Sequence, residues 1–276
     1  MPNHTNLPDA HATMLTRITA CLRDDLRFDA LLGSGSLVHG GFDAYSDLDL
    51  VLIVAPHAYD EVMVERESIA RSLGGLLTAF TGEHVGEPRL LICLYGPPLI
   101  HVDLKFIRLS DLEQAGGRPG ILWARNEQEV ALHINSADRR KSGSDPQWFE
   151  DRAWIWLHYG AAKLLRGELF EAIGMLAFFR ENILGPMWQR NMGLPQRGVR
   201  RIDNDSNARI ALAPTVPSYD FDSVKAALMQ SMLLYIELRE ADRPPVPTAL
   251  MPQVLIEFIE QTSVPHAGKH PPKSGL

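Results

Sequence analysis

The sequence of 276 residues predicts an α+β fold in two parts, strands and helices first and helices alone afterwards. In the first part, short apolar runs such as 48–54 end at turn residues, and 99–107 alternates apolar with polar residues. Both patterns are typical of β-strands. From Trp148 onwards apolar residues recur at helical spacing, which predicts a helical second part.

The elements of the first part follow from these periodicities. Leu15, Ile18, Leu22 and Leu26 recur at helical spacing and predict an amphipathic helix that ends near Arg27. The further expected elements are strands at 28–32, 48–54, 89–95 and 99–107, a short helix at 36–39 and a helix at 57–73. Residues 116–145 are rich in Gly, Asn and Ser, and 142–146 reads as a linker, so a domain boundary is expected there.

The second part is expected to be a bundle. Its predicted elements are helices at 148–166, 168–186, 224–240 and 250–261, with a long solvated connection at 193–219. Asp220 and Asp222 are candidate caps for the third of these helices. The Pro-, Lys- and Gly-rich end is expected to be disordered. The predicted domains are therefore 1–145, 146–263 and a tail at 264–276.

Composition narrows the classes of function. The net charge is −7 and the pI about 5.8, so the chain has no electrostatic footprint for nucleic acid. No apolar run approaches the length of a membrane span, and the first residues carry no apolar signal segment. The two cysteines, Cys21 and Cys93, lie in apolar patterns and are interpreted as reduced core residues. We expect a cytoplasmic protein without a membrane partner.

Two carboxylates mark the start of the predicted strand 48–54. Asp47 and Asp49 are two residues apart, so their side chains point to one face, roughly 6.5–7 Å apart along the chain, while Leu48 and Leu50 face the core. Neighbouring carboxylates repel each other unless a cation lies between them. Hard oxygen ligands at this spacing suit Mg²⁺.

A Gly-Ser turn precedes this strand. Glycine at position 35 lets the backbone approach a phosphate closely, and the N–H groups at the start of the helix that follows Ser36 favour anions. The alternative interpretation is a solvated Asp pair after a glycine turn. The combination of strand, turn, spacing and second strand favours the functional interpretation.

The spacing of these residues resembles the signature of the polymerase-beta-like nucleotidyltransferase superfamily, which is Gly-Ser, ten residues and Asp-x-Asp. The matching residues are Gly35, Ser36, Asp47 and Asp49, with Ser46 directly before the first aspartate. Residues 160–172, followed by Arg180-Glu-Asn182, resemble the helical domain of lincosamide and aminoglycoside nucleotidyltransferases. The resemblance covers most of residues 28–240. It implies a mixed sheet that carries the metals, flanked by helices, and a helical bundle that completes the nucleotide and acceptor pockets.

The resemblance also implies a third carboxylate from a neighbouring strand, and Asp103 is the position that matches. We expect the 99–107 strand to be an antiparallel partner of the 48–54 strand, with Asp103 as general base or metal ligand. The alternative is a surface aspartate on an edge strand. His101 and Lys105 share the face of Asp103 and are interpreted as rim residues.

These inferences combine into a predicted Mg²⁺-dependent nucleotidyltransferase that moves a nucleoside monophosphate, expected to be AMP from ATP, to a hydroxyl of a small molecule. Asp47, Asp49 and Asp103 are the predicted catalytic and metal residues. The predicted nucleotide contacts are Gly35, Ser36, Ser46, Lys163 and Arg166. For Lys163 and Arg166, charge on the helix surface is the competing interpretation.

The resemblance leaves the acceptor open. An aminoglycoside or lincosamide antibiotic is one class, which would make the chain a resistance enzyme. The alternatives are a protein or tRNA acceptor, as in toxin-like members, and a nucleotide-binding module without catalysis. ATP or another NTP is the expected partner, nucleic acid is disfavoured by the acidic charge, and the sequence is compatible with a homodimer.

Overall fold

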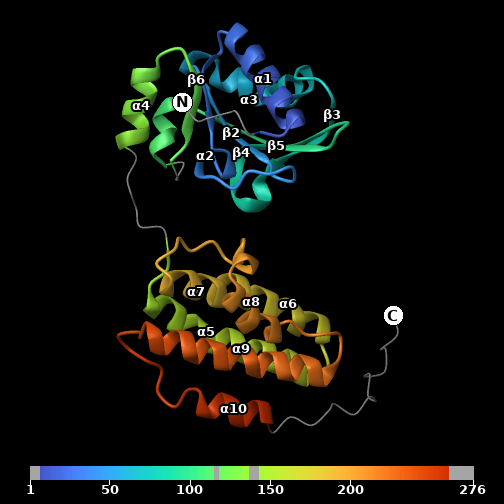
Figure 1. The fold of residues 1–276 in the computed structure, drawn as a ribbon, viewed down its shortest axis with the longest axis vertical. Coiled ribbons are helices and arrows are strands. Elements are labelled where there is room, and N and C mark those ends of the chain that lie inside the picture. The colour runs from blue at the N-terminus through green and yellow to red at the C-terminus, as the bar shows by residue number, and fades with distance from the viewer. Residues whose placement is uncertain (1–6, 115–117, 137–142, 261–276) are drawn as a thin grey trace, which may run out of the picture. The chain divides into compact units, whose positions relative to one another are not determined.

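The computed structural model describes residues 7–114, 118–136 and 143–260. The chain separates into two compact units, 1–139 and 140–276. Figure 1 shows a sheet with helices in the first unit and helices alone in the second. The predicted α+β class is confirmed. The catalytic and acceptor-closing roles predicted for the two parts, with their boundary at 145, stay a prediction.

The first unit is built on a mixed sheet with the strand order β3-β4-β5-β2-β1-β6. The strands are β1 (Phe28–Gly33), β2 (Leu48–Val54), β3 (Leu76–Gly82), β4 (Glu87–Tyr95), β5 (Ile100–Ile107) and β6 (Gly120–Ala124). The pair β2–β5 is parallel, and the other neighbouring pairs are antiparallel.

The expected antiparallel pairing of the strand that carries Asp103 is therefore wrong. After β2 the helix α3 (Tyr59–Ser72) returns the chain, and two successive antiparallel turns, β3 to β4 and β4 to β5, reverse it twice more. The chain thus enters β5 in the same direction as β2. A parallel pair requires such a crossover connection. The sequence of the strand does not reveal how many times the chain changes direction before it, so strand direction could not be predicted from it.

Helices cover the two faces of the sheet unequally. The helices α1 (Asp9–Asp24) and α3 pack on the face that carries Leu48, Leu50 and Leu52. On the other face α4 (Glu127–Ser136) and the 3-10 segment η4 (Leu109–Gln114) pack against Ala30 and Val51. The shorter elements of this unit are α2 (Ser36–His39), η2 (Pro56–Ala58) and η3 (Glu83–Val85).

Residues 116–145, for which the sequence predicted no strand or helix, contain regular structure. They include β6, which pairs antiparallel with β1, and α4. The side chain of Asp145 caps the next helix by accepting a hydrogen bond from the Trp148 amide at 2.8 Å. A five-residue edge strand carries little local signal, and its structure depends on pairing with a strand almost a hundred residues earlier.

The second unit is a helical bundle. Its elements are α5 (Pro146–Leu165), α6 (Leu169–Phe179), the π-helical segment η5 (Arg180–Leu184), α7 (Gly185–Asn191), η6 (Ile202–Asn204), α8 (Ser206–Leu212), η7 (Ala213–Thr215), α9 (Phe221–Ala241) and α10 (Gln253–Glu260). The core includes Phe149, Leu157, Phe179 and Tyr235. Asp220 caps α9, as predicted, by accepting from the Ser223 amide at 2.9 Å.

The connection predicted at 193–219 is wrong in part, because it contains α8. Asp205 caps this helix by accepting from the Asn207 amide at 2.9 Å. The predicted tail at 264–276 lies outside the described residues. In the part of the chain that the structure describes, no helix is both long enough and apolar enough to cross a bilayer.

Candidate functional site

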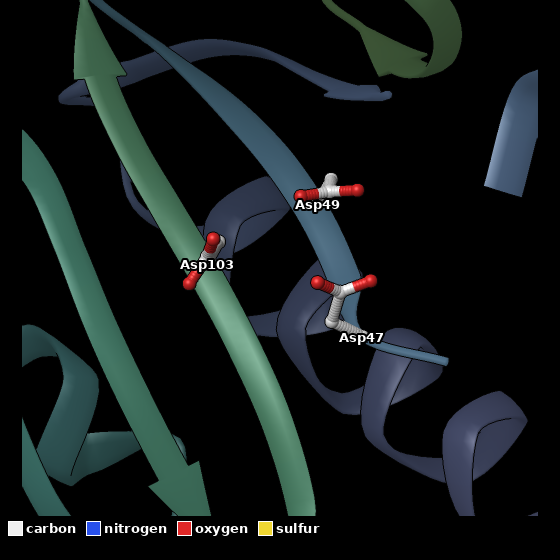
Figure 2. A group of neighbouring side chains, drawn as sticks. All are labelled: Asp47, Asp49 and Asp103. Carbon is white, nitrogen blue, oxygen red and sulfur yellow. The ribbon is translucent and has the colours of Figure 1, made fainter. Parts of the chain in front are cut away.

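Three carboxylates meet on the face of the sheet opposite α1 and α3. Asp47 and Asp49 lie at the start of β2, and Asp103 lies on β5 (Figure 2). One oxygen from each carboxylate can be chosen so that all three lie within 4.8 Å of one another. Within the described ranges, no other group of three His, Cys, Asp or Glu side chains gathers in this way. The predicted convergence of Asp103 with the Asp-x-Asp pair is therefore present in the structure.

The strand register explains this convergence. Leu48 and Leu50 are buried in the core at 0% and 2% exposure, which turns Asp49 to the opposite face. In the parallel pair β2–β5, Asp49 is the direct partner of Asp103. Paired residues on adjacent strands point to the same face, so the two carboxylates lie side by side.

The Gly-Ser turn lies directly against Asp49. The Ser34 amide donates a hydrogen bond to the Asp49 carbonyl oxygen at 2.8 Å. Gly35 has φ +56° and ψ −139°, and a Cβ at this position would lie 1.9 Å from Asp49 Oδ2. A residue with a side chain would thus meet both backbone strain and the carboxylate. Glycine at 35 is required for Asp49 to occupy this position.

Ser36 begins α2, next to this glycine. Its Oγ is buried and has no hydrogen-bond partner within the described part of the chain. A buried hydroxyl without a partner costs free energy unless a ligand or water satisfies it. This hydroxyl is consistent with the nucleotide contact predicted for Ser36.

The loop before Asp47 is held by α1. His11 is 5% exposed, and its Nε2 donates a hydrogen bond of 2.9 Å to the Ser46 carbonyl oxygen. Its ring also packs edge-on against Phe42 at 5.2 Å. The Ser46 hydroxyl is engaged within the loop, where it donates to Asp43 Oδ1 at 3.0 Å. Sequence analysis did not identify His11, because nothing local connects a helix residue with a loop 35 positions later.

His101 contacts the cluster directly. Its Nε2 lies 2.9 Å from Asp103 Oδ1, so this residue, interpreted from sequence as a rim position, is a neighbour of the predicted general base. Burial raises the pKa of Asp103, His101 opposes this shift, and the nearby negative charge of Asp47 adds to it. Residues 101 and 103 are two positions apart on one strand, so their side chains point to the same face, and this spacing predicts the contact.

Lys105 is engaged away from the carboxylates. Its Nζ lies 2.8 Å from Glu87 Oε2, and Arg89 Nε lies 2.7 Å from Glu87 Oε1. Hydrogen bonds from Arg89, together with Lys105, lower the pKa of Glu87 to about 2 against the cost of burial. This ion-pair group lies on β4 and β5, next to the strand position of Asp103.

Lys163 and Arg166 lie in the second unit and form ion pairs there. Lys163 Nζ is 2.7 Å from Glu168 Oε2 and 3.3 Å from Glu171 Oε1, and Arg166 Nε is 2.9 Å from Glu168 Oε1. These contacts agree with the alternative of charge on the helix surface. Their pairing with a phosphate stays a prediction.

The donor set fits a divalent cation. Three carboxylates supply hard oxygen ligands, which Mg²⁺ prefers over nitrogen or sulfur. The negative charge of Asp47 contributes to the raised pKa of Asp103, and a cation between such neighbouring carboxylates would favour their charged forms. Asp47, Asp49 and Asp103 are the residues that would hold the metal.

The solved structures that are similar to this chain include the following two. An aminoglycoside 6-adenyltransferase from Bacillus subtilis shares 14% identity with a TM-score of 0.39, over 89% of this chain and 95% of that one. A nucleotidyltransferase-like protein from Exiguobacterium sibiricum shares 11% identity with a TM-score of 0.39, over 83% of this chain and 76% of that one. No protein-family model matches the chain, and no curated protein does. The case for a function rests on the residues of the site.

Proposed function

We propose that this chain is a metal-dependent nucleotidyltransferase that transfers AMP from ATP to a hydroxyl of a small molecule. The observation that carries the proposal is the cluster of Asp47, Asp49 and Asp103, whose carboxylate oxygens lie within 4.8 Å of one another. The Gly-Ser turn packed against Asp49 supports it, because the Ser36 Oγ is buried there without a hydrogen-bond partner among the described residues. The sequence signature Gly-Ser, ten residues, Asp-x-Asp supports it independently.

The proposed reaction is an in-line displacement at the α-phosphorus of the nucleotide. The acceptor oxygen forms a bond to phosphorus, the bond to the β-phosphate oxygen breaks, and pyrophosphate leaves. When bound to the three carboxylates, Mg²⁺ would neutralise charge on the phosphate oxygens. Gly35 and Ser36 would contact the β- and γ-phosphates, with Ser46 as a weaker contact and Lys163 and Arg166 as further candidates.

We propose two alternative roles for Asp103, general base and metal ligand, and its position beside Asp47 and Asp49 is compatible with both. As a general base it accepts the proton of the acceptor hydroxyl, which contributes about 10²–10⁴-fold in rate. The raised pKa of this carboxyl suits proton acceptance. As a metal ligand it completes the set begun by Asp47 and Asp49. In either role His101, bound to Oδ1, restricts the orientation of the carboxylate.

The acceptor class belongs to the same proposal. A small hydroxyl compound, with aminoglycoside or lincosamide antibiotics as first candidates, is favoured over tRNA because the chain carries a net charge of −7. In the first case the chain would confer antibiotic resistance. A cytoplasmic location and a homodimer complete the proposal.

A pyrophosphate-release screen tests the function. The full chain is incubated with ATP or GTP and Mg²⁺ against aminoglycosides, lincosamides, simple sugars, a protein mixture and tRNA. We expect release with ATP and one of the small molecules. Release with tRNA or protein alone would replace the proposed acceptor class, and binding of ATP without any release would indicate a binding module.

A thermal-shift measurement tests the metal site separately. We expect ATP with Mg²⁺ to raise the melting temperature of the wild-type chain, because a ligand stabilises the folded state that binds it. The double substitution Asp47→Asn with Asp49→Asn should abolish this shift. Asp60→Asn, at a fully exposed carboxylate on α3, is the matched control and should keep it. A shift of wild-type size in the double variant would remove these aspartates from the site.

A further inference from the structure

The carboxylates belong to a row of residues that continues across the sheet. Asp49 on β2 is paired with Asp103 on β5, Asp103 with Ile92 on β4, and Ile92 with Phe80 on β3. Because paired residues on adjacent strands share a face, all of these side chains project from the same side of the sheet. Strands are spaced about 4.8 Å apart, so the row extends roughly 10 Å beyond Asp103.

Under the proposed reaction, the Asp49 end of the row faces the nucleotide and the end beyond Asp103 faces the acceptor. The Gly35 turn touches Asp49 from the side of β1, so the phosphates of the nucleotide would enter from that side. Asp103 lies on the other side of Asp49, and Ile92 follows it. Under the proposed reaction, the sheet surface next to Asp103 on the side away from the Gly35 turn is that of β4 and β3, where an acceptor whose hydroxyl reaches Asp103 has room to extend.

The surface over β4 and β3 is apolar. Phe80, Leu90, Ile92 and Leu94 form what we call the β3–β4 platform. Leu90 and Leu94 belong to it because they pair with Lys105 and His101, the residues that flank Asp103 on its own face. The Phe80 side chain is 55% exposed, and the three β4 residues are half-buried. The intervening residues Leu91 and Cys93 point into the core on the opposite face.

The charged groups beside the platform are paired with each other. Lys105 and Arg89 both bind Glu87, and the ring of Phe80 is packed at 5.5 Å from that of His84. Apart from Asp49 and Asp103, the residues of the rows named above carry no carboxylate. The platform offers little to a polycationic ligand and a good contact to a flat apolar one.

The helices described for this unit pack elsewhere. α1 and α3 cover the opposite face, and α4 with η4 packs against β1, β2, β6 and the end of β5, while Asp111 of η4 lies 3.8 Å from Arg89 beside the platform. The exposure of Phe80 agrees with this arrangement. Among the described residues, Phe80, Leu90, Ile92 and Leu94 belong to none of the apolar clusters of the two units.

We propose that the β3–β4 platform binds an apolar face of the acceptor, so that the preferred acceptor is an alcohol that carries a flat apolar group within about 10 Å of the reacting hydroxyl. This inference rests on the proposed function, because that function fixes the hydroxyl at Asp103. It makes Phe80 and Ile92 specificity-determining residues that contact the acceptor and take no part in proton transfer or metal binding.

Methyl NMR on the full chain tests the proposal with 2-phenylethanol as the probe. The isoleucine δ1-methyl groups are labelled with ¹³C, and the Ile92 signal is assigned through Ile92→Val. We expect 2-phenylethanol to shift the Ile92 signal in a saturable manner and ethanol at the same concentration to leave it in place. An equal response to both alcohols, or none to either, would overturn the proposal.

Substitution at Phe80 provides the matched comparison. Phe80→Ala should weaken the affinity for 2-phenylethanol by about fivefold or more, because it removes the exposed aromatic contact. Leu26→Ala is the control, since Leu26 is 75% exposed and precedes β1 at the end remote from Asp49. Unchanged affinity in Phe80→Ala, or an equal loss in Leu26→Ala, would contradict the platform.

Two further measurements separate the remaining outcomes. A soluble nitroxide should broaden the Ile92 signal of the free chain; a protected signal would mean that another part of the protein covers the platform, which would overturn the proposal. The 2-phenylethanol titration is then repeated with Asp47→Asn, in which the Ile92 response should persist. If the wild type shows the Ile92 response but no thermal shift with ATP and Mg²⁺, the proposed function fails and the apolar site stands. If the thermal shift is present and the Ile92 response is absent, the platform alone fails.

Discussion

At the scale of single residues, Gly35 is the position on which the site depends most. Its backbone conformation at φ +56° is one that residues with a side chain rarely adopt, and the space for a Cβ is already filled by Asp49 Oδ2. The sequence predicts that this glycine leaves space for a phosphate, which stays a prediction. In the structure the space is taken by the Asp49 carboxylate.

Gly35→Ala should therefore displace Asp49 and abolish the thermal shift given by ATP and Mg²⁺. The backbone strain should also lower the free energy of unfolding by about 1–3 kcal/mol. Gly86→Ala is the control, because Gly86 has φ +74° with nothing within 4 Å of the added Cβ. It should share the loss of stability and retain the thermal shift, which thermal melts with and without ligand will show. Retained ligand binding in Gly35→Ala would show that Asp49 is not held by this turn.

Asp103→Asn separates the roles of the third carboxylate. We expect the rate of a single turnover to fall by about 10²-fold or more in either role. If Asp103 is the general base, the affinity for ATP with Mg²⁺ should persist, because the amide fills the same space. If it is a metal ligand, affinity and rate should fall together. Near-normal turnover would exclude Asp103 from the active site.

At the scale of elements, Glu87 connects β4 to β5 beside the site. Its carboxylate lies between Arg89 of its own strand and Lys105 of the neighbouring strand, and its pKa falls from 4.5 to about 2. A depressed carboxyl pKa contributes stability that is fully present above the unfolded-state value and is lost as the pH falls through the folded-state value. The window for this group therefore extends from about pH 4.5 down to about pH 2.

Glu87→Gln should lower the free energy of unfolding by about 1–2 kcal/mol at pH 7. This is less than the free energy that corresponds to the whole pKa shift, because the carboxylate is partly exposed and solvent screens it. The difference from the wild type should shrink as the pH falls from 4.5 towards 2. Denaturant unfolding at a series of pH values measures it. Glu67→Gln, at an exposed pair with Arg71, is the control and should change stability by less than about 0.5 kcal/mol at any pH. If the difference in free energy of unfolding between the wild type and Glu87→Gln grew as the pH fell, it would contradict the lowered pKa of Glu87.

At the scale of the whole molecule, the chain carries separate cores. The first unit is organised around the sheet, with apolar clusters on both faces, and the second is organised around a bundle with its own cluster. The second core contains a buried charge. Glu150 on α5 is 1% exposed and receives hydrogen bonds from Trp154 Nε1 at 2.9 Å and the Thr248 amide at 2.7 Å.

The same carboxylate joins α5 to α9. Glu150 accepts from the Tyr235 hydroxyl and lies 2.8 Å from Arg239 Nε. Burial alone would raise its pKa, but the hydrogen bonds from Tyr235, Thr248 and Trp154 outweigh burial and lower it. The group is therefore charged in the folded protein, and removing it leaves the Arg239 guanidinium without its partner.

Glu150→Gln should destabilise the second unit by about 3–5 kcal/mol, the usual effect of removing one partner of a buried ion pair. Tryptophan fluorescence is suited to the measurement, because Trp148, Trp154, Trp156 and Trp188 lie in this unit. Asp151→Asn is the neighbouring control, with its side chain bound to Gln147 on the surface, and should have an effect below about 0.5 kcal/mol. An effect of that small size in Glu150→Gln would mean that the buried network contributes nothing net.

The sequence by itself determined the local features of both units. The two-residue period of a strand puts Asp47 and Asp49 on the face opposite Leu48 and Leu50, and the alternation of 99–107 puts Asp103 on one face with His101 and Lys105. The Gly-Ser turn, the short helix after it and the Asp220 cap were likewise predicted, and the structure confirms them. These features depend on residues within a few positions of one another, and short-range sterics and hydrogen bonds decide them.

Only the tertiary structure decided which distant residues meet. The parallel pairing of β2 with β5 sets Asp49 opposite Asp103, and the same register leads on to Ile92 and Phe80. The contact of His11 with the Ser46 carbonyl and the pairing of β6 with β1 are also long-range. Register and strand direction follow from how the intervening chain crosses the sheet and packs its apolar face, and neither is encoded in the strand segments themselves.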